Sequence, residues 1–471
     1  MSLSESHFLE KKNIIVAGAG VAGLAFAISL RKKWNNELSP PRLTVYDRDG
    51  RKIDPKRQGY SLSINGVDKD GGLVALQKLG LLDRVIEKAT PGTTDMPLKV
   101  WDNTWTELIS VSPKPFGDLP VAGLRIPRAN LREILIEEAE GLGIDIKWES
   151  QCLSASPLED GGMSVTVSSS DGSHTFQETC DILVAADGAH SKIRASLRPD
   201  DTLQYAGATQ IGGLAVFPDG TPQPLNGAWG ILISGHGNSC FAAPIQDKTV
   251  VWALSKPDEM LAQPAGGDGK ALLEEARQHC GKISEPFESL LNATDPSTAF
   301  AIPARDKKPF NHQDTTPGVI FIGDSNHAVS PFAGNGANTA LQDGWDLADF
   351  LISSDSMGSA VSVSISKPLM DANSTELARS SRSLNSDPEA CGGDGLEAHL
   401  RRVERGCGGI IVLASDLNPC PLPIVQVLGI PGCRGRNTDV GARGLIGEER
   451  DGDTVELDRT IPGVGQNVCL R

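Results

Sequence analysis

The feature that most constrains this chain is a glycine-rich turn near its N-terminus, Gly18-Ala19-Gly20-Val21-Ala22-Gly23. The turn follows the short apolar run 13–17, typical of a buried parallel strand, and precedes residues 21–34, whose composition favours a helix. In such a turn the first glycine allows the tight bend, the second lets the backbone approach a pyrophosphate, and the third permits close helix–strand packing. The phosphates would sit on the free N–H groups at the start of the helix.

An acidic residue stands where a dinucleotide site requires one. The apolar run 43–46 predicts the next strand, and Asp47 follows it, 24 residues after Gly23. A carboxylate in this place holds a ribose hydroxyl of a bound dinucleotide. A glycine-rich turn alone could serve packing only, but the succession of strand, turn, helix, strand and acid predicts dinucleotide binding. The motif does not choose between FAD and NAD.

Two later turns also place a carboxylate after an apolar strand. Asp187 follows the run 182–186, and Asp324 follows Gly323 after the run 319–322. Because ligands of open α/β sheets bind at the carboxyl ends of the strands, both aspartates are candidate ligand contacts.

A glycine-rich segment follows the third turn. Residues 334–338 lead into a helix that we expect to begin near Ala337. The free N–H groups and the positive dipole end of this helix could stabilise negative charge on a ligand.

The strand and helix patterns divide the chain into parts. Between about residues 205 and 254, β-rich segments alternate with Gly/Pro turns, whereas strand and helix patterns alternate before and after them. We therefore predict an α/β fold with a Rossmann-like nucleotide-binding domain, discontinuous over 12–200 and 300–352. It would enclose an inserted, mostly antiparallel β-sheet substrate domain at 201–299.

Residues 357–471 differ from the rest. The chain has seven Trp, three Tyr and twelve Phe, and Phe350 is the last of them. A long segment without aromatic residues lacks the side chains that usually dominate core burial. It is also rich in Gly, Ser, Pro and Asp, which favours low order. We predict an atypical, disordered C-terminal tail; a regulatory tail and a sequence altered from its ancestor are the alternatives.

Charge and composition limit the kinds of partner and the cellular compartment that we expect for this chain. The formal net charge of −16 argues against nucleic acid and anionic membrane surfaces. No run of about 18 apolar residues predicts a membrane span, and the polar start of the chain does not predict a signal peptide. The nine cysteines form no CxxC pair or Cys/His cluster, so neither a metal site nor a disulfide framework is expected. These features favour a cytoplasmic protein with reduced thiols.

From about residue 12 to 352 the chain resembles the FAD-dependent aromatic hydroxylases, or class A flavoprotein monooxygenases, especially their fungal and tetracycline-modifying members. The resemblance rests on the GxGxxG turn, on Asp187-Gly188 followed by Ser191 and Arg194, and on Gly323-Asp324 followed by Pro331 and Gly336. Three motifs in the right order are more specific than any one of them. The discontinuous domain would then be an FAD-binding domain.

The resemblance also implies roles for individual residues. Gly18, Gly20 and Gly23 would cradle the pyrophosphate of FAD, and Asp47 would bind the adenosine ribose. Asp324 would bind a ribityl hydroxyl. The other expected cofactor contacts are Arg57 and Gly59 at the flavin–substrate boundary, Arg128 on the nucleotide chain, Asp187 on flavin and reductant, and Gly334, Gly336 and Ala337 facing the flavin ring.

The implied reaction is oxygenation. NADPH or NADH would reduce FAD, and one oxygen atom of O₂ would pass to a small organic substrate, aromatic or a secondary metabolite. This agrees with the lack of a GxSxG, HExxH or Cys/His constellation, and no catalytic residue is identified. Two other readings stay open: an NAD(P)-dependent dehydrogenase, which leaves Asp187 and Asp324 without a role, and an inactive FAD-binding remnant, which the tail favours.

Several residues near the motifs have simpler interpretations. His327 is expected to be a loop histidine bonded to backbone. Arg125 and Arg132 are expected to form only helix-surface ion pairs. Trp252 is expected to pack in the core of the β insert. The segment Ser325-Asn326 departs from the two alanines that the family has there.

Overall fold

The fold is described from a computed structural model of the chain. It describes residues 6–52, 61–94, 96–246, 248–258, 268–310, 316–331, 334–354, 410–416 and 423–429. The predicted contacts Arg57 and Gly59 lie outside these ranges. In the predicted tail, two strands are described, β18 (Ile410–Asp416) and β19 (Pro423–Gly429), which pair antiparallel. The low order expected for the other residues of the tail lies outside the described residues.

A parallel five-stranded sheet forms the centre of the nucleotide-binding part. Its order is β17-β11-β1-β2-β7, so the chain winds outward in both directions from β1. This confirms the predicted Rossmann-like α/β class. The strands are β1 (Asn13–Ala17), β2 (Arg42–Tyr46), β7 (Asp145–Lys147), β11 (Ile182–Ala185) and β17 (Val319–Phe321).

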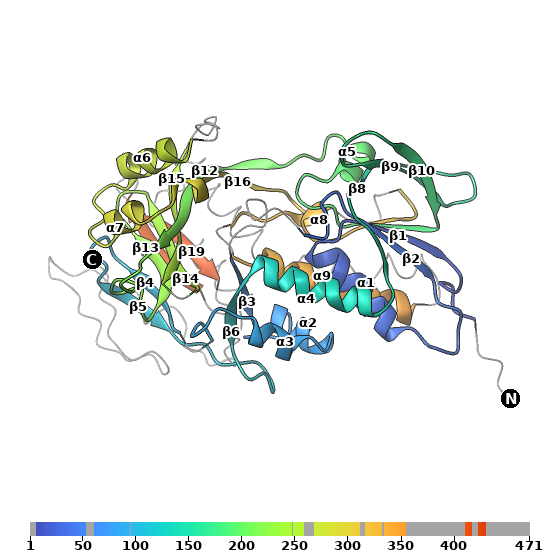
Figure 1. The fold of residues 1–471 in the computed structure, drawn as a ribbon, viewed down its shortest axis with the longest axis horizontal. Coiled ribbons are helices and arrows are strands. Elements are labelled where there is room, and N and C mark those ends of the chain that lie inside the picture. The colour runs from blue at the N-terminus through green and yellow to red at the C-terminus, as the bar shows by residue number, and fades with distance from the viewer. Residues whose placement is uncertain are drawn as a thin grey trace, which may run out of the picture.

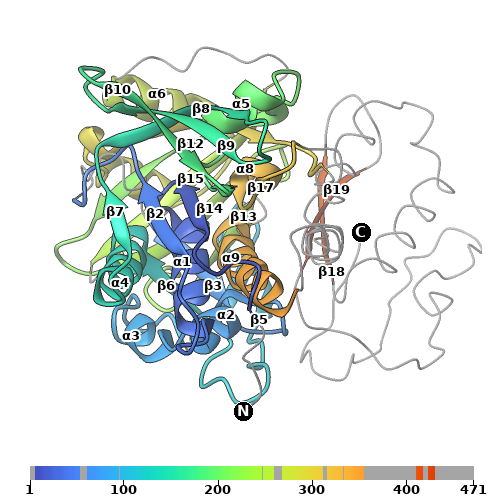
Figure 2. The same cartoon turned by 90° about the vertical axis from the view of Figure 1, so that its right-hand side faces the viewer.

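Both faces of this sheet are covered, which explains why its strands are apolar throughout. Ile14 and Val16 face the helices on one side, and Ile15 and Ala17 face a three-stranded sheet on the other. The helices are α1 (Val21–Lys33), α4 (Arg128–Gly141) and α9 (Gly336–Ser353), with the shorter α2 (Gly72–Lys78) and α3 (Leu82–Glu87) beside them. Figure 2 shows these helices on one side of β2 and β17, with the small sheet on the other. That sheet consists of β8 (Ser150–Pro157), β9 (Met163–Ser169) and β10 (Thr175–Cys180).

A larger sheet lies at the other end of the molecule's long axis (Figure 1). Its order is β16-β12-β15-β14-β13-β4-β5, and all neighbours are antiparallel except β13 and β4. Its strands are β4 (Leu98–Trp101), β5 (Glu107–Val111), β12 (Gln204–Val216), β13 (Trp229–Ile233), β14 (Ser239–Gln246), β15 (Thr249–Pro257) and β16 (Phe300–Asp306). Trp252 lies fully buried in the core of this part, as predicted. Because β4, β5 and β16 come from outside residues 201–299, the predicted domain boundaries do not coincide with the limits of the sheet.

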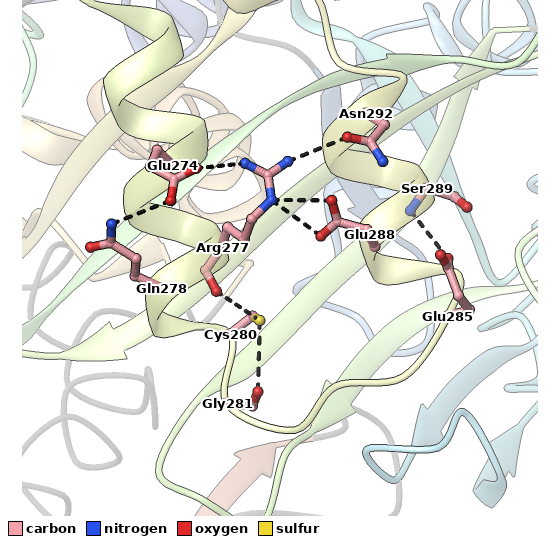
Figure 3. Close-up of polar contacts among 9 residues, drawn as sticks. All are labelled: Glu274, Arg277, Gln278, Cys280, Gly281, Glu285, Glu288, Ser289 and Asn292. Atoms are coloured by element: carbon pink, nitrogen blue, oxygen red, sulfur yellow. Dashed lines mark hydrogen bonds and ion pairs between the residues drawn. The ribbon is translucent and has the colours of Figure 1, made fainter.

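Two helices cover the large sheet and are joined by one arginine. α6 (Gly269–His279) and α7 (Phe287–Asn292) lie side by side, and Arg277 of α6 reaches between them (Figure 3). Its guanidinium pairs with Glu274 at 2.8 Å and with Glu288 at 3.1 Å. This is an exposed ion-pair network, which contributes little to stability.

A two-stranded ribbon connects the two parts. β3 (Ser61–Asn65) pairs antiparallel with β6 (Gly123–Pro127), and β6 leads directly into α4. The chain between them forms α2, α3, β4 and β5.

The contact of α1 with α9 requires a glycine. A Cβ atom added at Gly344 would lie 2.6 Å from the Phe26 nitrogen and 2.7 Å from the Ala22 oxygen, both backbone atoms of α1. We expect Gly344→Ala to lower the free energy of unfolding by about 1–3 kcal/mol through overpacking. Thermal unfolding checks this. The control is Gly141→Ala at the exposed end of α4, where no atom lies within 4 Å of the added Cβ; equal melting temperatures of the two variants would contradict the packing argument.

Candidate functional site

The three predicted turns meet in space. They follow β1, β11 and β17, which are neighbours in the parallel sheet, so all three lie at its carboxyl edge. A Cβ atom at Gly18 would lie 2.4 Å from the Ala186 oxygen, and one at Gly323 would lie 3.0 Å from the Ala22 Cβ. The first turn therefore touches both later turns.

The glycine turn has the geometry that the sequence predicts. Gly18 has a φ of +108°, which favours glycine, and a Cβ atom at Gly23 would lie 2.0 Å from the Gly18 oxygen. At Gly20, in contrast, no atom lies within 4 Å of an added Cβ. Gly20 caps α1 without a side-chain hydrogen bond, and the first turn of α1 holds no acidic residue. The first N–H groups of α1 thus have no side-chain acceptor beside an open backbone, which suits a phosphate.

Asp47 is attached to the glycine turn. Its Oδ2 accepts the Ala19 N–H at 2.7 Å, and its Oδ1 accepts the Asp49 N–H at 2.8 Å. Burial raises the pKa of Asp47, and these backbone hydrogen bonds and the nearby charge of Arg132 oppose the rise. Both carboxylate oxygens keep lone pairs for a further donor such as a hydroxyl.

Asp187 has an oxygen without a partner. Its Oδ2 accepts the N–H groups of Lys192, at 2.7 Å, and Ile193, at 3.2 Å, at the start of α5 (Lys192–Leu197). Its Oδ1 is buried and has no hydrogen-bond partner in the part of the chain that the structure describes. Burial also raises the pKa of Asp187. A buried acceptor without a donor is rare in a folded protein, so a donor from a ligand fits this position.

Arg194 joins the second and third turns. It is 4% exposed, and its Nη1 donates to the Ser325 oxygen at 2.7 Å and its Nε to the Asp201 oxygen at 3.1 Å. Sequence reasoning noted Arg194 only as part of a motif and assigned it no role. The residues next to Arg194 in the sequence give no sign that one of its partners is the backbone carbonyl of Ser325, 131 residues away.

Asp324 is the first residue of the short helix α8 (Asp324–His327). Its side chain is exposed, and its Oδ1 lies 3.9 Å from a Cβ atom added at Gly336, which begins α9. The surrounding protein desolvates the carboxylate and raises its pKa, while the charges of His327, Arg128 and Arg194 oppose the rise. Arg128, exposed at the start of α4, therefore lies near Asp324, and it also acts on Arg132.

The start of α9 faces the same edge. Gly334 has a φ of +59° with open space around its added Cβ, and Gly336 and Ala337 open the helix. The N-cap residue Asn335 makes no side-chain cap, so the first N–H groups of this 18-residue helix lack a side-chain acceptor.

Asn338 fixes the position of this helix start, and sequence reasoning did not single it out. Its Oδ1 accepts the Asn65 N–H at 2.9 Å, and its Nδ2 donates to the Ser63 oxygen at 3.0 Å. α9 is thereby attached to β3.

The interpretation of His327 as a backbone-bonded loop histidine was wrong. His327 ends α8 and is buried, and its Nε2 contacts the Asp343 Oδ2 of α9 at 2.6 Å. The same Oδ2 accepts the Gly323 N–H at 2.6 Å. Asp343 thus holds both ends of the turn that presents Asp324, a pairing across 16 residues that the local sequence does not indicate.

The helix-surface interpretation of Arg125 and Arg132 was also wrong. Arg125 lies on β6 and is 3% exposed, so it is not on a helix. Arg132 is on α4, but it donates to the backbone oxygens of Arg51 and Gly50 and lies over the Trp148 ring. Within the described residues, the hydrogen-bond partners of Arg125 and Arg132 are a serine hydroxyl and backbone oxygens, not carboxylates.

Two further findings concern the described residues only. None of their helices is long and apolar enough to cross a membrane. No group of three or more His, Cys, Asp or Glu side chains among them is placed to hold a metal ion.

Comparison with known proteins agrees with this geometry. The family model of the FAD binding domain matches residues 11–361. The chain is 44% identical to monooxygenase cfoF of Aspergillus candidus over 366 residues, which cover 76% of this chain and 88% of that protein. It is 28% identical to the FAD-dependent monooxygenase nscC of Trichophyton tonsurans, over 73% of this chain and 86% of that protein. The fold is similar to that of Klebsiella pneumoniae HpxO complexed with FAD and uric acid, with a TM-score of 0.63, 18% identity, and coverage of 85% and 94% of the two chains.

The pair of His327 and Asp343 predicts a pH dependence. Burial alone would lower the pKa of His327, but the charge of Asp343, its hydrogen bond and the charge of Asp324 outweigh burial and raise it. The protonated histidine therefore stabilises the fold fully below the unfolded-state pKa of about 6.5, and this contribution is lost as the pH rises through the higher folded-state pKa. We expect Asp343→Asn to lower the pKa of His327 and to reduce this alkaline loss of stability. NMR titration of the histidine ring and unfolding between about pH 6 and 9 check this; an unchanged His327 titration would refute the pairing.

Proposed function

Because this chain belongs to the FAD binding domain family and is an FAD-dependent monooxygenase, we propose that its three strand-end turns enclose one FAD, reduced by NADPH or NADH. The substrate is a small organic molecule, which we propose to be aromatic or a secondary metabolite. The observation that carries the cofactor assignment is the convergence of the Gly18, Asp187 and Asp324 turns at one sheet edge.

The first turn supplies the pyrophosphate contacts. We assign these to Gly18, Gly20 and Gly23, since the backbone at Gly20 is open and the N–H groups of α1 have no side-chain acceptor. Asp47, held against Ala19, would accept a hydrogen bond from the adenosine ribose.

The later turns supply the contacts toward the flavin. Asp324 would accept a ribityl hydroxyl, and Arg128, whose charge acts on Asp324, would contact the nucleotide chain. The start of α9 at Gly334, Gly336 and Ala337 would face the flavin ring. Its N–H groups would stabilise the negative charge of the reduced flavin. The other proposed contacts are Asp187, with its free Oδ1, and, by resemblance alone, Arg57 and Gly59.

Bound FAD supplies the electron transfer and oxygen activation that the side chains of a protein cannot. The chain's own residues would bind and orient the cofactor and the substrate, and they would exclude water from the site. Asn338 fixes the start of α9 against β3, and Asp343 fixes the turn that carries Asp324. Both groups of proposed flavin contacts are therefore held in a defined position. The large sheet would form the substrate side of the site. We assign no proton-transfer residue.

Neither alternative gains support. A dehydrogenase would need no contacts from the Asp187 and Asp324 turns, yet both converge on the glycine turn. The named relatives are monooxygenases, and nothing in the comparisons favours an inactive remnant. We keep the division into an FAD-binding domain (12–200 and 300–352) and a substrate domain (201–299) as a proposal; sheet pairing would add β4, β5 and β16 to the latter.

The proposed activity predicts how the purified protein behaves. We expect it to contain about one FAD per chain, to be reduced by NADPH or NADH without oxygen, and to consume oxygen on re-exposure to air. Anaerobic absorbance spectra and an oxygen electrode measure these steps. Flavin that neither nucleotide reduces would refute the proposed reductant, and protein without flavin would refute the function itself.

The cofactor contacts predict separate effects on folding and on FAD affinity. An alanine at Gly20 meets no atom of the protein, so Gly20→Ala should fold normally but bind FAD at least about tenfold more weakly, because its methyl group meets the phosphates. Asp324→Asn should weaken FAD binding by about tenfold to a hundredfold through loss of a charge-assisted hydrogen bond. The flavin-to-protein ratio and fluorescence titration measure both.

Matched controls are available for these variants. Gly227→Ala adds a methyl group where no atom lies within 4 Å, and Asp219→Asn changes an exposed aspartate of the large-sheet part. Both should bind FAD as the wild type does. Wild-type FAD affinity in Gly20→Ala and Asp324→Asn would contradict the site assignment.

A further inference from the structure

Arg125 carries a buried positive charge that has no anionic partner among the residues the structure describes. Its side chain is 3% exposed on β6, and its Nη1 donates to the Ser63 hydroxyl at 2.8 Å. Its Nε is buried and has no acceptor. Among the described residues no carboxylate pairs with it, and burial, the sole cause acting on it, lowers the pKa of Arg125 to about 10. The guanidinium therefore stays charged at neutral pH.

Comparison with two other arginines, Arg194 and Arg277, shows which acceptors the guanidinium of Arg125 lacks among the described residues. Arg194 is equally buried, but its guanidinium donates to backbone oxygens from three segments. Arg277 is paired with two carboxylates on the surface (Figure 3). A guanidinium has five N–H donors, and a buried charge left uncompensated is strongly unfavourable. Within the described part of the chain, the guanidinium of Arg125 has one acceptor, the neutral Ser63 hydroxyl, so an anion would complete its environment.

Aromatic rings occupy the other side of the guanidinium. The Phe241 ring of β14 lies 4.9 Å from the Arg125 guanidinium carbon, and the Trp229 ring of β13 lies 5.6 Å from it. These rings attract the cation through their faces, but they cannot accept in-plane N–H hydrogen bonds as an oxygen does. They also displace water, which strengthens the attraction of Arg125 for an anion.

Arg125 lies where the two parts of the molecule meet. Its partner Ser63 is on β3, and the backbone oxygen of Ser63 accepts a hydrogen bond from Asn338 in the first turn of α9. That turn is the proposed flavin-ring end of the site. The aromatic rings belong to the large sheet, the proposed substrate side. Arg125 is thus two hydrogen bonds away from the start of α9 and in contact with the opposite wall.

We propose that Arg125 binds a negatively charged oxygen group of the substrate, a carboxylate or an ionised phenol or enol, and so selects acidic substrates. This inference rests on the proposed function, because it places the substrate between the flavin end of α9 and the large sheet. The planar guanidinium can engage two oxygens at once, which fixes orientation as well as charge. Arg125 is then a specificity-determining residue.

The test compares matched acids and amides at constant ionic strength. The probes are acetate, benzoate and 2-hydroxybenzoate against acetamide, benzamide and 2-hydroxybenzamide, added to flavin-loaded wild type, Arg125→Gln, Arg125→Lys and Arg277→Gln. Binding is measured through the visible absorbance of the flavin and through the melting temperature. A further probe, 4-nitrophenol, reports a phenolate site, because a site that selects its ionised form increases its visible absorbance at fixed pH.

We expect the wild type to bind at least one anion about tenfold more tightly than its neutral partner, and Arg125→Gln to reduce this preference to within about twofold. Arg277→Gln, the same change at a paired surface arginine, should keep it. A preference for carboxylates without a response from 4-nitrophenol identifies a carboxylate site, and the reverse identifies a phenolate or enolate site.

Other results would overturn the proposal. Equal binding of every acid and its amide to wild type, with no ionisation of 4-nitrophenol, shows that Arg125 does not recognise anions. A preference that survives in Arg125→Gln places the anion elsewhere. If Arg125→Gln does not fold, Arg125→Lys decides, since it keeps the charge but loses the planar fork: unchanged acid affinity in it refutes the role. The melting temperature needs no flavin, so a protein without FAD would refute the proposed function while the acid–amide comparison still tests Arg125.

Discussion

The close approach of the glycine turn to the end of β11 is the contact on which the rest of the site depends. Gly18 passes so near the Ala186 oxygen that a methyl group would overlap it, and the third glycine, Gly23, lies against the Gly18 oxygen. This brings α1 down onto the sheet and leaves its first N–H groups at the same edge as Asp187. The position of α1 in turn determines that of α9, because α9 packs closely on α1 at Gly344. Close packing of the backbone therefore forms the sheet edge where the cofactor would bind, and the aspartate side chains project from that edge.

Aspartates and arginines, charges of both signs, follow this edge, and the neighbouring Arg128 and Arg132 repel each other. Asp47 interacts with Arg132, Arg132 with Arg128, Arg128 with Asp324, and Asp324 with Arg194, which also acts on Asp187. Desolvation by the surrounding protein raises the pKa of Asp47, Asp187 and Asp324 and lowers that of Arg132 and Arg194, so each of these charges is unfavourable alone. The attraction between the aspartates and the arginines offsets part of this desolvation cost. A ligand with both hydroxyl donors and phosphate charges can offset the remainder. Polar groups held in this way cost little reorganisation when the ligand arrives.

The sequence predicted the parts of the fold that depend on local pattern. Apolar runs such as 13–17 and 182–186 form neighbouring parallel strands, as predicted. The turns of Gly18, Asp187 and Asp324 lie at one edge because the carboxyl ends of parallel strands all meet at the same edge of an open sheet. It could not predict partners set by tertiary contact. His327 was expected to bond to backbone, but Asp343, on the next helix, is its partner, and Arg125 was expected on a helix surface but lies inside a strand pair. The pairing of β4 with β13 joins segments about 130 residues apart, and no local signal carries that information.

The way the chain connects the two sheets explains how a residue such as Arg125 can act on chemistry in the other part. The chain leaves the nucleotide-binding part after α3, forms β4 and β5 in the large sheet, and returns through β6. It crosses again from β11 to β12 and returns from β16 to β17. Parts joined by several short connections cannot rotate freely against each other, unlike domains on one linker. The distance between the start of α9 and the Phe241 and Trp229 rings is therefore set by the fold itself. A guanidinium fixed between them by Ser63 can hold a ligand in one orientation, and orientation is the main contribution that a protein makes to a reaction carried by its cofactor.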